Sequence, residues 1–268
     1  MEKLTVLFIF LIIILLCAIL INFILSSNKI PRIIWTYWDG DIPDIIKKCI
    51  HSWKQYNPNH KIIILNNTNI PDFIKNLRHA KDNPTRRSDY IRLYILQRYG
   101  GIWMDASIIC NGPLPIDYNS DFSGYYLDAF TIPELKKCSP VIESWFLACK
   151  KNNLFVKKWY EEFMKTDNYE NIDDYLDALT KEGIQHKINI PNYLTIHISA
   201  QAVLQRNPCE FILNLLKAED TAFKYLTDNE WNTEKSIIAL TQDKYNDQPI
   251  IKLRGSERIY LESLDKNL

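Results

Sequence analysis

Two short apolar segments separated by one amphipathic helix constrain the fold of this chain more than any other feature. Residues 32–37 and 61–65 are apolar and have the length of strands. Between them, apolar side chains recur at helical spacing, at Ile45, Ile46, Cys49, Ile50 and Trp53. Strand, helix and strand within about 35 residues form the βαβ unit of an open α/β sheet.

The next part of the chain places a carboxylate at the end of a strand. The pattern predicts a helix over residues 85–99, which Gly100-Gly101 ends, and a strand over residues 102–104. Asp105 then stands at the carboxyl end of that strand, the edge where ligands bind in open α/β sheets.

The rest of the sequence predicts further helices and two further strands, with no repeat and no linker that would divide the chain. The expected helices cover residues 139–151, 154–165, 172–180, 199–205 and 210–217, and the expected strands cover 236–240 and 249–253. We therefore expect a single catalytic domain over residues 30–268, of a size that suits one α/β domain.

The N-terminus has the composition of a membrane anchor. Residues 4–25 are almost unbroken Leu, Ile, Val and Phe without a charge, and a helix of that length spans the ~30 Å hydrocarbon core. A cleaved signal peptide is the competing interpretation, but no A-x-A pattern follows the apolar run. We expect an uncleaved single-pass anchor within residues 1–29. Positive charges flank both ends, so the side of the membrane on which the domain lies is undetermined.

Charge and cysteine content limit the function classes. Lys plus Arg and Asp plus Glu both number 32, so the formal net charge is zero, which argues against nucleic acid as a partner. The cysteines beyond the apolar N-terminus fit neither a zinc site nor a dense disulfide framework, and we expect most of them to be reduced and buried.

Three charged residues between positions 86 and 108 form the candidate site. Asp89 and Arg92 are three apart on the expected helix and share a face, and the helix leads through Gly-Gly to Asp105. A carboxylate at a strand end can accept sugar hydroxyls or bind a divalent ion, and an Arg can neutralise diphosphate oxygens. Taken alone, the same residues also fit a helical surface pair and a turn cap.

This segment resembles the sugar-binding region of the DXD-type glycosyltransferases, and is most similar to their capsular polysaccharide synthesis relatives. The resemblance rests on Ser-Asp-Tyr-Ile-Arg over residues 88–92 and Tyr-Gly-Gly-Ile-Trp-Met-Asp-Ala-Ser over residues 99–107. Shorter matches are Ile-Trp-Thr-Tyr-Trp over residues 34–38 and Ser-Trp-Phe-Leu-Ala over residues 144–148. Together they extend from about residue 31 to residue 165, with a fainter match at residues 250–254.

The resemblance implies a GT-A-like, Rossmann-like α/β fold, a nucleotide-diphosphate sugar donor, a divalent cation (Mn²⁺ or Mg²⁺) and retention of anomeric configuration. By position, Trp35 would stack on the base, and Asp89 and Arg92 would contact the ribose or donor sugar. Gly101 would belong to the same substrate-binding region, and Asp105 would contact the sugar and the metal shell as the catalytic carboxylate. Independently of the resemblance, Trp38 follows the first strand, where a loop can line the donor pocket.

One position departs from the DXD pattern. A DXD motif would place a second carboxylate at position 107, and this chain has Ser107. A hydroxyl is a weaker, uncharged metal ligand, so Ser107 is a weak candidate for the metal shell. Ser256, in the C-terminal Arg-Gly-Ser-Glu segment, is a second weak candidate.

The sequence is best explained by an enzyme of polysaccharide biosynthesis, a hexosyltransferase-like glycosyltransferase. It would move a sugar from a nucleotide-diphosphate sugar to a hydroxyl of a glycan, a glycolipid or lipid-linked glycan, or a protein. The missing second carboxylate motivates one alternative, a membrane-anchored nucleotide-sugar-binding protein with little activity. A nucleotide-sugar hydrolase on the same fold is another.

Overall fold

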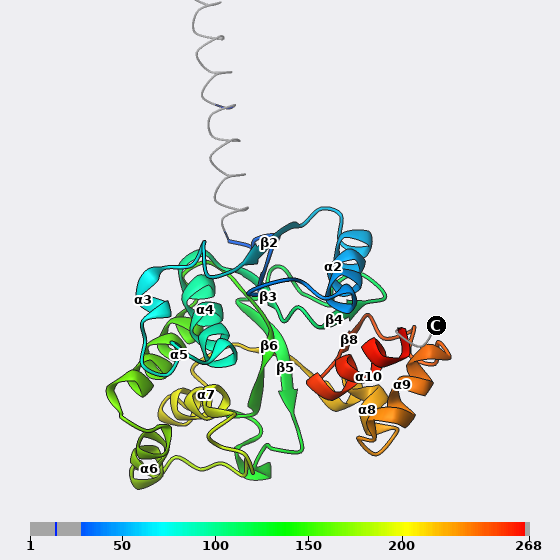
Figure 1. Ribbon diagram of the computed structural model, residues 1–268. Coiled ribbons are helices and arrows are strands. Elements are labelled where there is room, and N and C mark those ends of the chain that lie inside the picture. Colours follow the sequence, from blue (N-terminus) through cyan, green and yellow to red (C-terminus); the bar gives the residue numbers. More distant parts are fainter. Residues whose placement is uncertain (1–13, 15–27, 266–268) are drawn as a thin grey trace, which may run out of the picture.

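A six-stranded mixed sheet forms the centre of the molecule. The computed structural model describes residue 14 and residues 28–265. The strands of the main sheet lie in the order β2-β1-β3-β6-β5-β7, and β4 and β8 form a separate two-stranded sheet (Figure 1). The strands are β1 Ile33–Tyr37, β2 Lys61–Leu65, β3 Gly101–Met104, β4 Ile108–Cys110, β5 Phe122–Leu127, β6 Val141–Cys149, β7 Asn214–Lys217 and β8 Ile250–Lys252.

Helices cover both faces of the main sheet. In Figure 1, α3, α4, α5 and α7 lie on one side of it, and α2 with α8, α9 and α10 on the other. The helices are α2 Asp44–Tyr56, α3 Asp72–Lys75, α4 Pro84–Tyr99, α5 Leu154–Met164, α6 Ile172–Glu182, α7 Thr195–Arg206, α8 Lys224–Thr227, α9 Thr233–Thr241 and α10 Gly255–Asp265. The buried apolar residues form one large core on each side of the sheet.

The strand directions bring the first three strands to a common edge. β1 pairs in parallel with β2 and with β3, whereas β6 pairs antiparallel with β3 and β5, and β7 is parallel to β5. The fold is therefore mixed α/β, as expected, and the carboxyl ends of β1, β2 and β3 lie together. The βαβ unit predicted over residues 32–65 is confirmed.

Local signals explain the helix that leads to the predicted site. Asn83 accepts the backbone N–H of Arg86 with its side chain, and Pro84 opens α4. The helix ends at Gly100, whose φ of +65° suits glycine. The chain then enters β3 through Gly101, at φ +98°. The predicted helix over 85–99 and strand over 102–104 are thus confirmed to within a residue.

Three predicted elements were wrong. Residues 141–149 form strand β6, where a helix was expected over 139–151. The sequence could not distinguish the two, because a strand buried on both faces shows no alternation of apolar and polar residues. Residues 214–217 form strand β7 at the sheet edge, where a helix was expected over 210–217. Residues 233–241 form helix α9, capped by the Asn232 side chain, where a strand was expected over 236–240.

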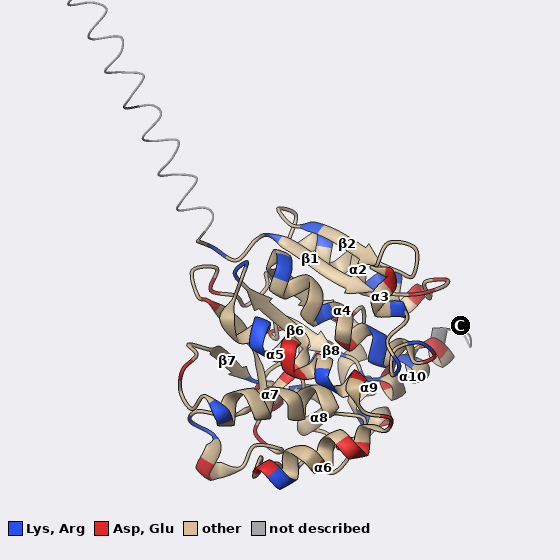
Figure 2. Cartoon of the chain, turned by 90° about the vertical axis from the view of Figure 1, so that its left-hand side faces the viewer, with Lys and Arg blue, Asp and Glu red and all other residues tan. Residues whose placement is uncertain are grey.

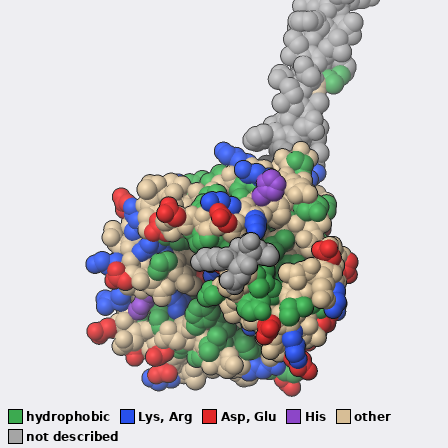
Figure 3. All heavy atoms as spheres, turned by 45° about the vertical axis from the view of Figure 1, so that its right-hand side comes forward, with side chains coloured by type: hydrophobic (Ala, Val, Ile, Leu, Met, Phe, Trp, Pro, Cys, Tyr) green, Lys and Arg blue, Asp and Glu red, His purple; other side chains and the backbone are tan. Residues whose placement is uncertain are grey.

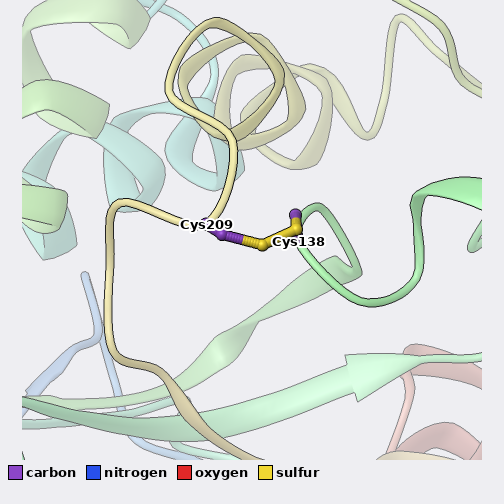
Figure 4. Close-up of a disulfide and its surroundings, with 2 residues drawn as sticks. All are labelled: Cys138 and Cys209. Carbon is purple, nitrogen blue, oxygen red and sulfur yellow. A yellow bond between two sulfur atoms is a disulfide. The ribbon is translucent and has the colours of Figure 1, made fainter.

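The cysteine prediction was correct for three residues and wrong for two. Cys49, Cys110 and Cys149 are free and buried. Cys138, in the loop before β6, and Cys209, in the loop after α7, form a disulfide across 71 residues of sequence (Figure 4). The spacing of these two residues gave no sign of the pairing, because the fold brings together loops that are distant in sequence.

The expected membrane anchor lies, apart from Ile14, outside the described residues. Within residues 28–265, no helix has the length and apolar character that crossing a membrane requires. Figure 2 shows Lys and Arg interspersed with Asp and Glu over the helices and loops of this part of the chain.

Candidate active site

Asp105 lies directly after β3, at the edge where the parallel strands end. Its backbone N–H donates to the carbonyl of Trp145 on β6 at 2.9 Å, and its carbonyl accepts the N–H of Ile108 at 3.1 Å. These bonds fix the turn that separates β3 from β4. The Asp105 side chain is 26% exposed, so its carboxylate can reach a bound molecule.

Three donors from different parts of the chain face the Asp105 carboxylate. Trp103 Nε1 donates to Oδ1 at 3.0 Å, Arg92 Nη2 lies 3.4 Å from Oδ1, and Lys252 Nζ lies 3.1 Å from Oδ2. Burial alone would raise the pKa of Asp105, but the charges of Lys252 and Arg92 and the hydrogen bond from Trp103 outweigh it. The pKa of Asp105 is consequently below its usual range, and the carboxylate is ionised at neutral pH.

Asp89 and Arg92 form a buried ion pair on one face of α4, as the spacing predicted. Arg92 Nη2 lies 3.2 Å from Asp89 Oδ1, and Arg86 Nη1 lies 3.9 Å from Asp89 Oδ2. Arg92 Nη1 also donates to the carbonyl and the hydroxyl of Ser144, at 2.7 and 2.8 Å. Burial raises the pKa of Asp89, and the two guanidinium groups offset that rise only in part. The pair is internal and links α4 to β6 rather than being a surface contact.

Gly101 and the side chain of Trp35 lie at the amino end of β3, away from Asp105. Trp35 and Trp103 are paired in register on neighbouring strands, but Trp35 Nε1 donates to the carbonyl of Gly100 at 3.0 Å, at the amino end of β3. The Trp35 ring is 9% exposed and packs against Tyr99. A Cβ on Gly101 would lie 2.8 Å from the Ile33 carbonyl oxygen. The structure therefore gives both residues a packing role, and it does not bring them to the carboxylate.

The two serine residues predicted as weak metal ligands are committed elsewhere. Ser107 is buried, donates its hydroxyl to the Leu253 carbonyl at 2.9 Å, and accepts a hydrogen bond from Lys252 Nζ at 2.7 Å. Ser256 is exposed in the first turn of α10 and donates to Glu257 Oε1 at 2.9 Å. Glu257 is itself paired with Arg254 at 2.6 Å.

The side chains around the Asp105 carboxylate are not suitable ligands for a divalent cation. Such ions take several oxygen ligands, whereas the groups that face the Asp105 carboxylate, from Trp103, Arg92 and Lys252, are all N–H donors. The hydroxyl at the expected second position already accepts a hydrogen bond from the lysine ammonium. No cluster of three or more His, Cys, Asp or Glu residues suited to a metal occurs within the described part of the chain. We therefore assign the positive charge at this edge to Lys252 and Arg92.

Two aromatic residues border the site. Trp38 follows β1, is partly exposed, and donates Nε1 to the Asp41 carbonyl at 3.0 Å, with the Arg258 guanidinium 5.8 Å from its ring centre. Tyr193 is 63% exposed. Partial desolvation raises the pKa of the Tyr193 phenol and the charges of Asp89 and Asp105 add to the rise, so it lies within electrostatic range of the site. Because Trp38 directly follows β1, it lies at the carboxyl edge of the parallel strands, as expected.

Sequence reasoning missed three residues of this region, Lys252, Trp103 and Glu143. Lys252 and Trp103 contact Asp105 directly, and the buried pair of Glu143 and His197 joins β6 to α7, with Nε2 and Oε2 3.1 Å apart. Trp103 lies two residues before Asp105 on the same strand, so its position was a usable signal. Lys252 lies within the faint family match at residues 250–254, which gave no sign of its contact with Asp105, and Glu143 had no signal.

Curated relatives are similar to part of this chain. O-glycosyltransferase braB of Annulohypoxylon truncatum is 27% identical over 49% of this chain and 37% of its own length. Inositol phosphoceramide mannosyltransferase 1 of Schizosaccharomyces pombe is 30% identical over 33% of this chain and 31% of its own length. The chain therefore matches only about a third of the length of these relatives.

Solved structures show only distant likeness. The PaToxG glycosyltransferase is similar over 89% of this chain and 90% of its own, with 16% identity and a TM-score of 0.42. At that TM-score the likeness supports no conclusion about fold or activity.

The family comparison covers most of the chain. Residues 23–246 match the sequence profile of the family described as capsular polysaccharide synthesis protein. The match includes the α4–β3 segment that holds Asp89, Arg92 and Asp105, and it confirms the resemblance found in the motifs. This chain is therefore a member of the capsular polysaccharide synthesis protein family.

Proposed function

We propose that this chain is a glycosyltransferase that moves a sugar from a nucleotide-diphosphate donor to a hydroxyl group of an acceptor. One observation supports the proposal most directly. Asp105, at the carboxyl edge of the parallel strands, keeps an ionised and partly exposed carboxylate between two cationic side chains. Membership of the capsular polysaccharide synthesis family and the names of the curated relatives agree with this activity.

A site that catalyses this transfer must orient the donor sugar and stabilise the leaving diphosphate. A carboxylate held in place can accept hydrogen bonds from donor-sugar hydroxyls and orient the sugar for attack. Positive charge beside it stabilises the diphosphate as the bond to the sugar breaks. In this chain Asp105 orients the sugar, and Arg92 and Lys252 stabilise the diphosphate. Hydrogen bonds to neighbouring side chains hold each of the three groups in place. No covalent nucleophile is assigned.

The finer features of the proposal rest on the sequence. Retention of anomeric configuration, a GT-A-like domain over residues 30–268, and a glycan, lipid-linked glycan or protein acceptor follow from the family resemblance. A membrane anchor within residues 1–29 rests on the apolar composition of residues 4–25. The divalent cation implied by the resemblance, Mn²⁺ or Mg²⁺, is a variable of the experiment below.

Exposed apolar surface is available to an acceptor. On the face shown in Figure 3, hydrophobic side chains gather in the middle and charged side chains lie largely around them. The connection between α6 and α7 exposes Ile190 and Tyr193, at 50% and 63%. An amphipathic acceptor such as a lipid-linked glycan would match a surface of this kind.

The test is a donor screen with the full chain. Nucleotide-sugars are incubated with and without Mn²⁺ or Mg²⁺ and with glycan, glycolipid and peptide acceptors, and donor consumption and product are measured. We expect one donor to be consumed in an acceptor-dependent way, and Asp105→Asn to lower turnover at least about 100-fold. Asp177→Asn, at an exposed position on α6, is the matched control and should be fully active.

Three results would contradict the proposal. Release of free sugar at a rate insensitive to acceptor would indicate a hydrolase. Donor binding without turnover would indicate a binding protein. Unchanged turnover in Asp105→Asn would remove the site from the chemistry.

A further inference from the structure

We propose that Lys252 replaces the divalent cation as the group that binds the diphosphate of the donor. The inference rests on the proposed function, because it names the group at the same site that receives the donor phosphates. It starts from the one departure from the DXD pattern, the hydroxyl of Ser107 where that pattern has a second carboxylate.

The fold holds Lys252 firmly in place. Strand β8 pairs antiparallel with β4, and the register places Lys252 opposite Ile108. Its backbone N–H donates to the Ala222 carbonyl at 3.1 Å, and its carbonyl accepts the Tyr225 hydroxyl at 2.8 Å. The Lys252 side chain is 11% exposed, so most of it is packed while its ammonium group lies at the exposed carboxylate of Asp105.

Ser107 is oriented to hold an ammonium group. Its hydroxyl proton is committed to the Leu253 carbonyl, at 2.9 Å, which leaves the oxygen lone pairs to accept Lys252 Nζ at 2.7 Å. Lys252 Nζ also lies 3.1 Å from Asp105 Oδ2 and 3.3 Å from the Leu253 carbonyl oxygen. The last contact is the longest of the three, and it is the one that a phosphate oxygen would replace.

The charge at the motif equals that of a metal-bound DXD pair. Two carboxylates and one divalent ion sum to zero, and Asp105, neutral Ser107 and cationic Lys252 also sum to zero. Serine in place of a carboxylate at position 107 removes one negative charge. Lys252, with one positive charge, takes the place of a divalent ion with two, so the total charge is unchanged. An ammonium group is a compact point charge that commonly binds phosphate.

Lys252 is not the only group that neutralises Asp105. Arg92 and the Trp103 indole already face Oδ1 of the same carboxylate. Across the linked contacts there are three cations, Arg86, Arg92 and Lys252, and two carboxylates, Asp89 and Asp105. The linked groups therefore carry one positive charge more than negative charges, and an anionic ligand would balance it.

The first experiment measures nucleotide binding without metal. UDP, GDP, CDP and the sugar donor identified in the screen are titrated into the full chain by calorimetry, in EDTA and in Mn²⁺. We expect dissociation constants for the wild-type chain that agree within about twofold between the two conditions, and Lys252→Ala to weaken binding at least about tenfold. Lys252→Arg keeps the charge and should restore most of the affinity. Lys244→Ala, at an exposed lysine of the same C-terminal segment, is the control.

A second experiment builds the DXD pattern into this chain. The double variant Ser107→Asp with Lys252→Ala replaces the lysine and serine pair with a second carboxylate. We expect its donor binding and turnover to be at least about tenfold stronger in Mn²⁺ than in EDTA, whereas the wild-type chain shows no such dependence. A merely structural ion pair would not transfer metal dependence in this way. Circular dichroism of each variant checks that it is folded.

The outcomes separate this inference from the proposed function. If the wild-type chain binds and turns over a donor only with Mn²⁺, and folded Lys252→Ala does the same, Lys252 is not the phosphate-binding group, although the transferase proposal stands. If no nucleotide or donor binds in either condition, both proposals are overturned.

Discussion

The guanidinium of Arg92 lies between two carboxylates, with Nη2 3.4 Å from Asp105 Oδ1 and 3.2 Å from Asp89 Oδ1. Its other terminal nitrogen donates twice to Ser144 on β6. One side chain therefore joins α4, β6 and the exposed carboxylate. The planar arrangement of its donors allows these contacts to form together, which a single ammonium group cannot reproduce.

Replacing Arg92 by lysine keeps the charge and removes this geometry. We expect Arg92→Lys to lower kcat/KM at least about tenfold and to destabilise the fold by roughly 1–3 kcal/mol, because Ser144 and Asp89 lose buried partners. Donor turnover and thermal unfolding measure the two effects. Arg98→Lys, at an exposed position of the same helix, is the control and should behave like the wild-type chain. Equal activity of Arg92→Lys and the wild-type chain would contradict a positioning role for the guanidinium.

Glu257 gives the stability of the C-terminal helices a dependence on acid pH. It is fully buried and accepts from Arg254, Thr233 and Ser256. Burial would raise the pKa of Glu257, but the hydrogen bonds and the Arg254 charge outweigh it and lower the pKa from 4.5 to about 2. The folded-state pKa lies below the unfolded one. The contribution to stability is therefore complete above pH 4.5 and is lost as the pH falls toward 2.

Denaturant unfolding between pH 2.5 and 7 checks this sign. We expect Glu257→Gln to destabilise the fold at neutral pH, by an amount on the order of 3 kcal/mol or less, and to flatten the loss of stability below pH 4.5. Glu234→Gln, at an exposed position on α9, should keep the wild-type pH profile. If Glu257→Gln and the wild-type chain lose stability in parallel as the pH falls, Glu257 is not the group responsible.

Local spacing was sufficient for the part of the site that one segment builds. Asp89 and Arg92 lie one helical turn apart and Asp105 follows a short strand, so the contacts of α4 and β3 could be predicted from sequence alone. Lys252 could not be predicted, because its contact with Asp105 depends on the pairing of β4 with β8 across most of the chain.

A side chain can lie on a strand that ends at the site and still point away from the site. Trp35 was expected to stack on the base, and its strand does end at the site edge. Yet its ring turns toward Gly100, while its in-register neighbour Trp103 turns toward Asp105. The alternation of a strand assigns a face of the sheet but not the end toward which a long side chain leans. The helix predicted over 139–151 was wrong for a related reason, since a fully buried strand has no period of two.

Gly101 is required for close packing between β1 and β3. It lies at φ +98°, and a Cβ there would come within 2.8 Å of the Ile33 carbonyl oxygen and 2.9 Å of Trp35 Nε1. We expect Gly101→Ala to destabilise the fold by roughly 2–4 kcal/mol, from backbone strain together with overpacking. Gly183→Ala is a matched control, because Gly183 has φ +95° and nothing within 4 Å of the added carbon. It should cost about 1 kcal/mol from the backbone alone. Equal unfolding free energies of the two variants would contradict the packing argument.

The disulfide between Cys138 and Cys209 gives a prediction that separates bonded from free thiols. It joins the loop before β6 to the loop after α7 and closes 71 residues of sequence. A loop of this length restricts the unfolded chain, so we expect Cys138→Ser with Cys209→Ser to lower the free energy of unfolding by roughly 2–4 kcal/mol. Reduction of the wild-type chain should lower its free energy of unfolding by the same amount, and reductant should not change that of the double variant.

Thiol labelling provides the second measurement. In denaturant without reductant, peptides that contain Cys49, Cys110 and Cys149 should be labelled, and those that contain Cys138 and Cys209 should be labelled only after reduction. A chain isolated under oxidising conditions whose Cys138 and Cys209 label without reductant would contradict the disulfide. If they are protected and the double variant is nonetheless as stable as the wild-type chain, the loop-closure argument fails, because the bond would exist without restricting the unfolded chain enough to matter.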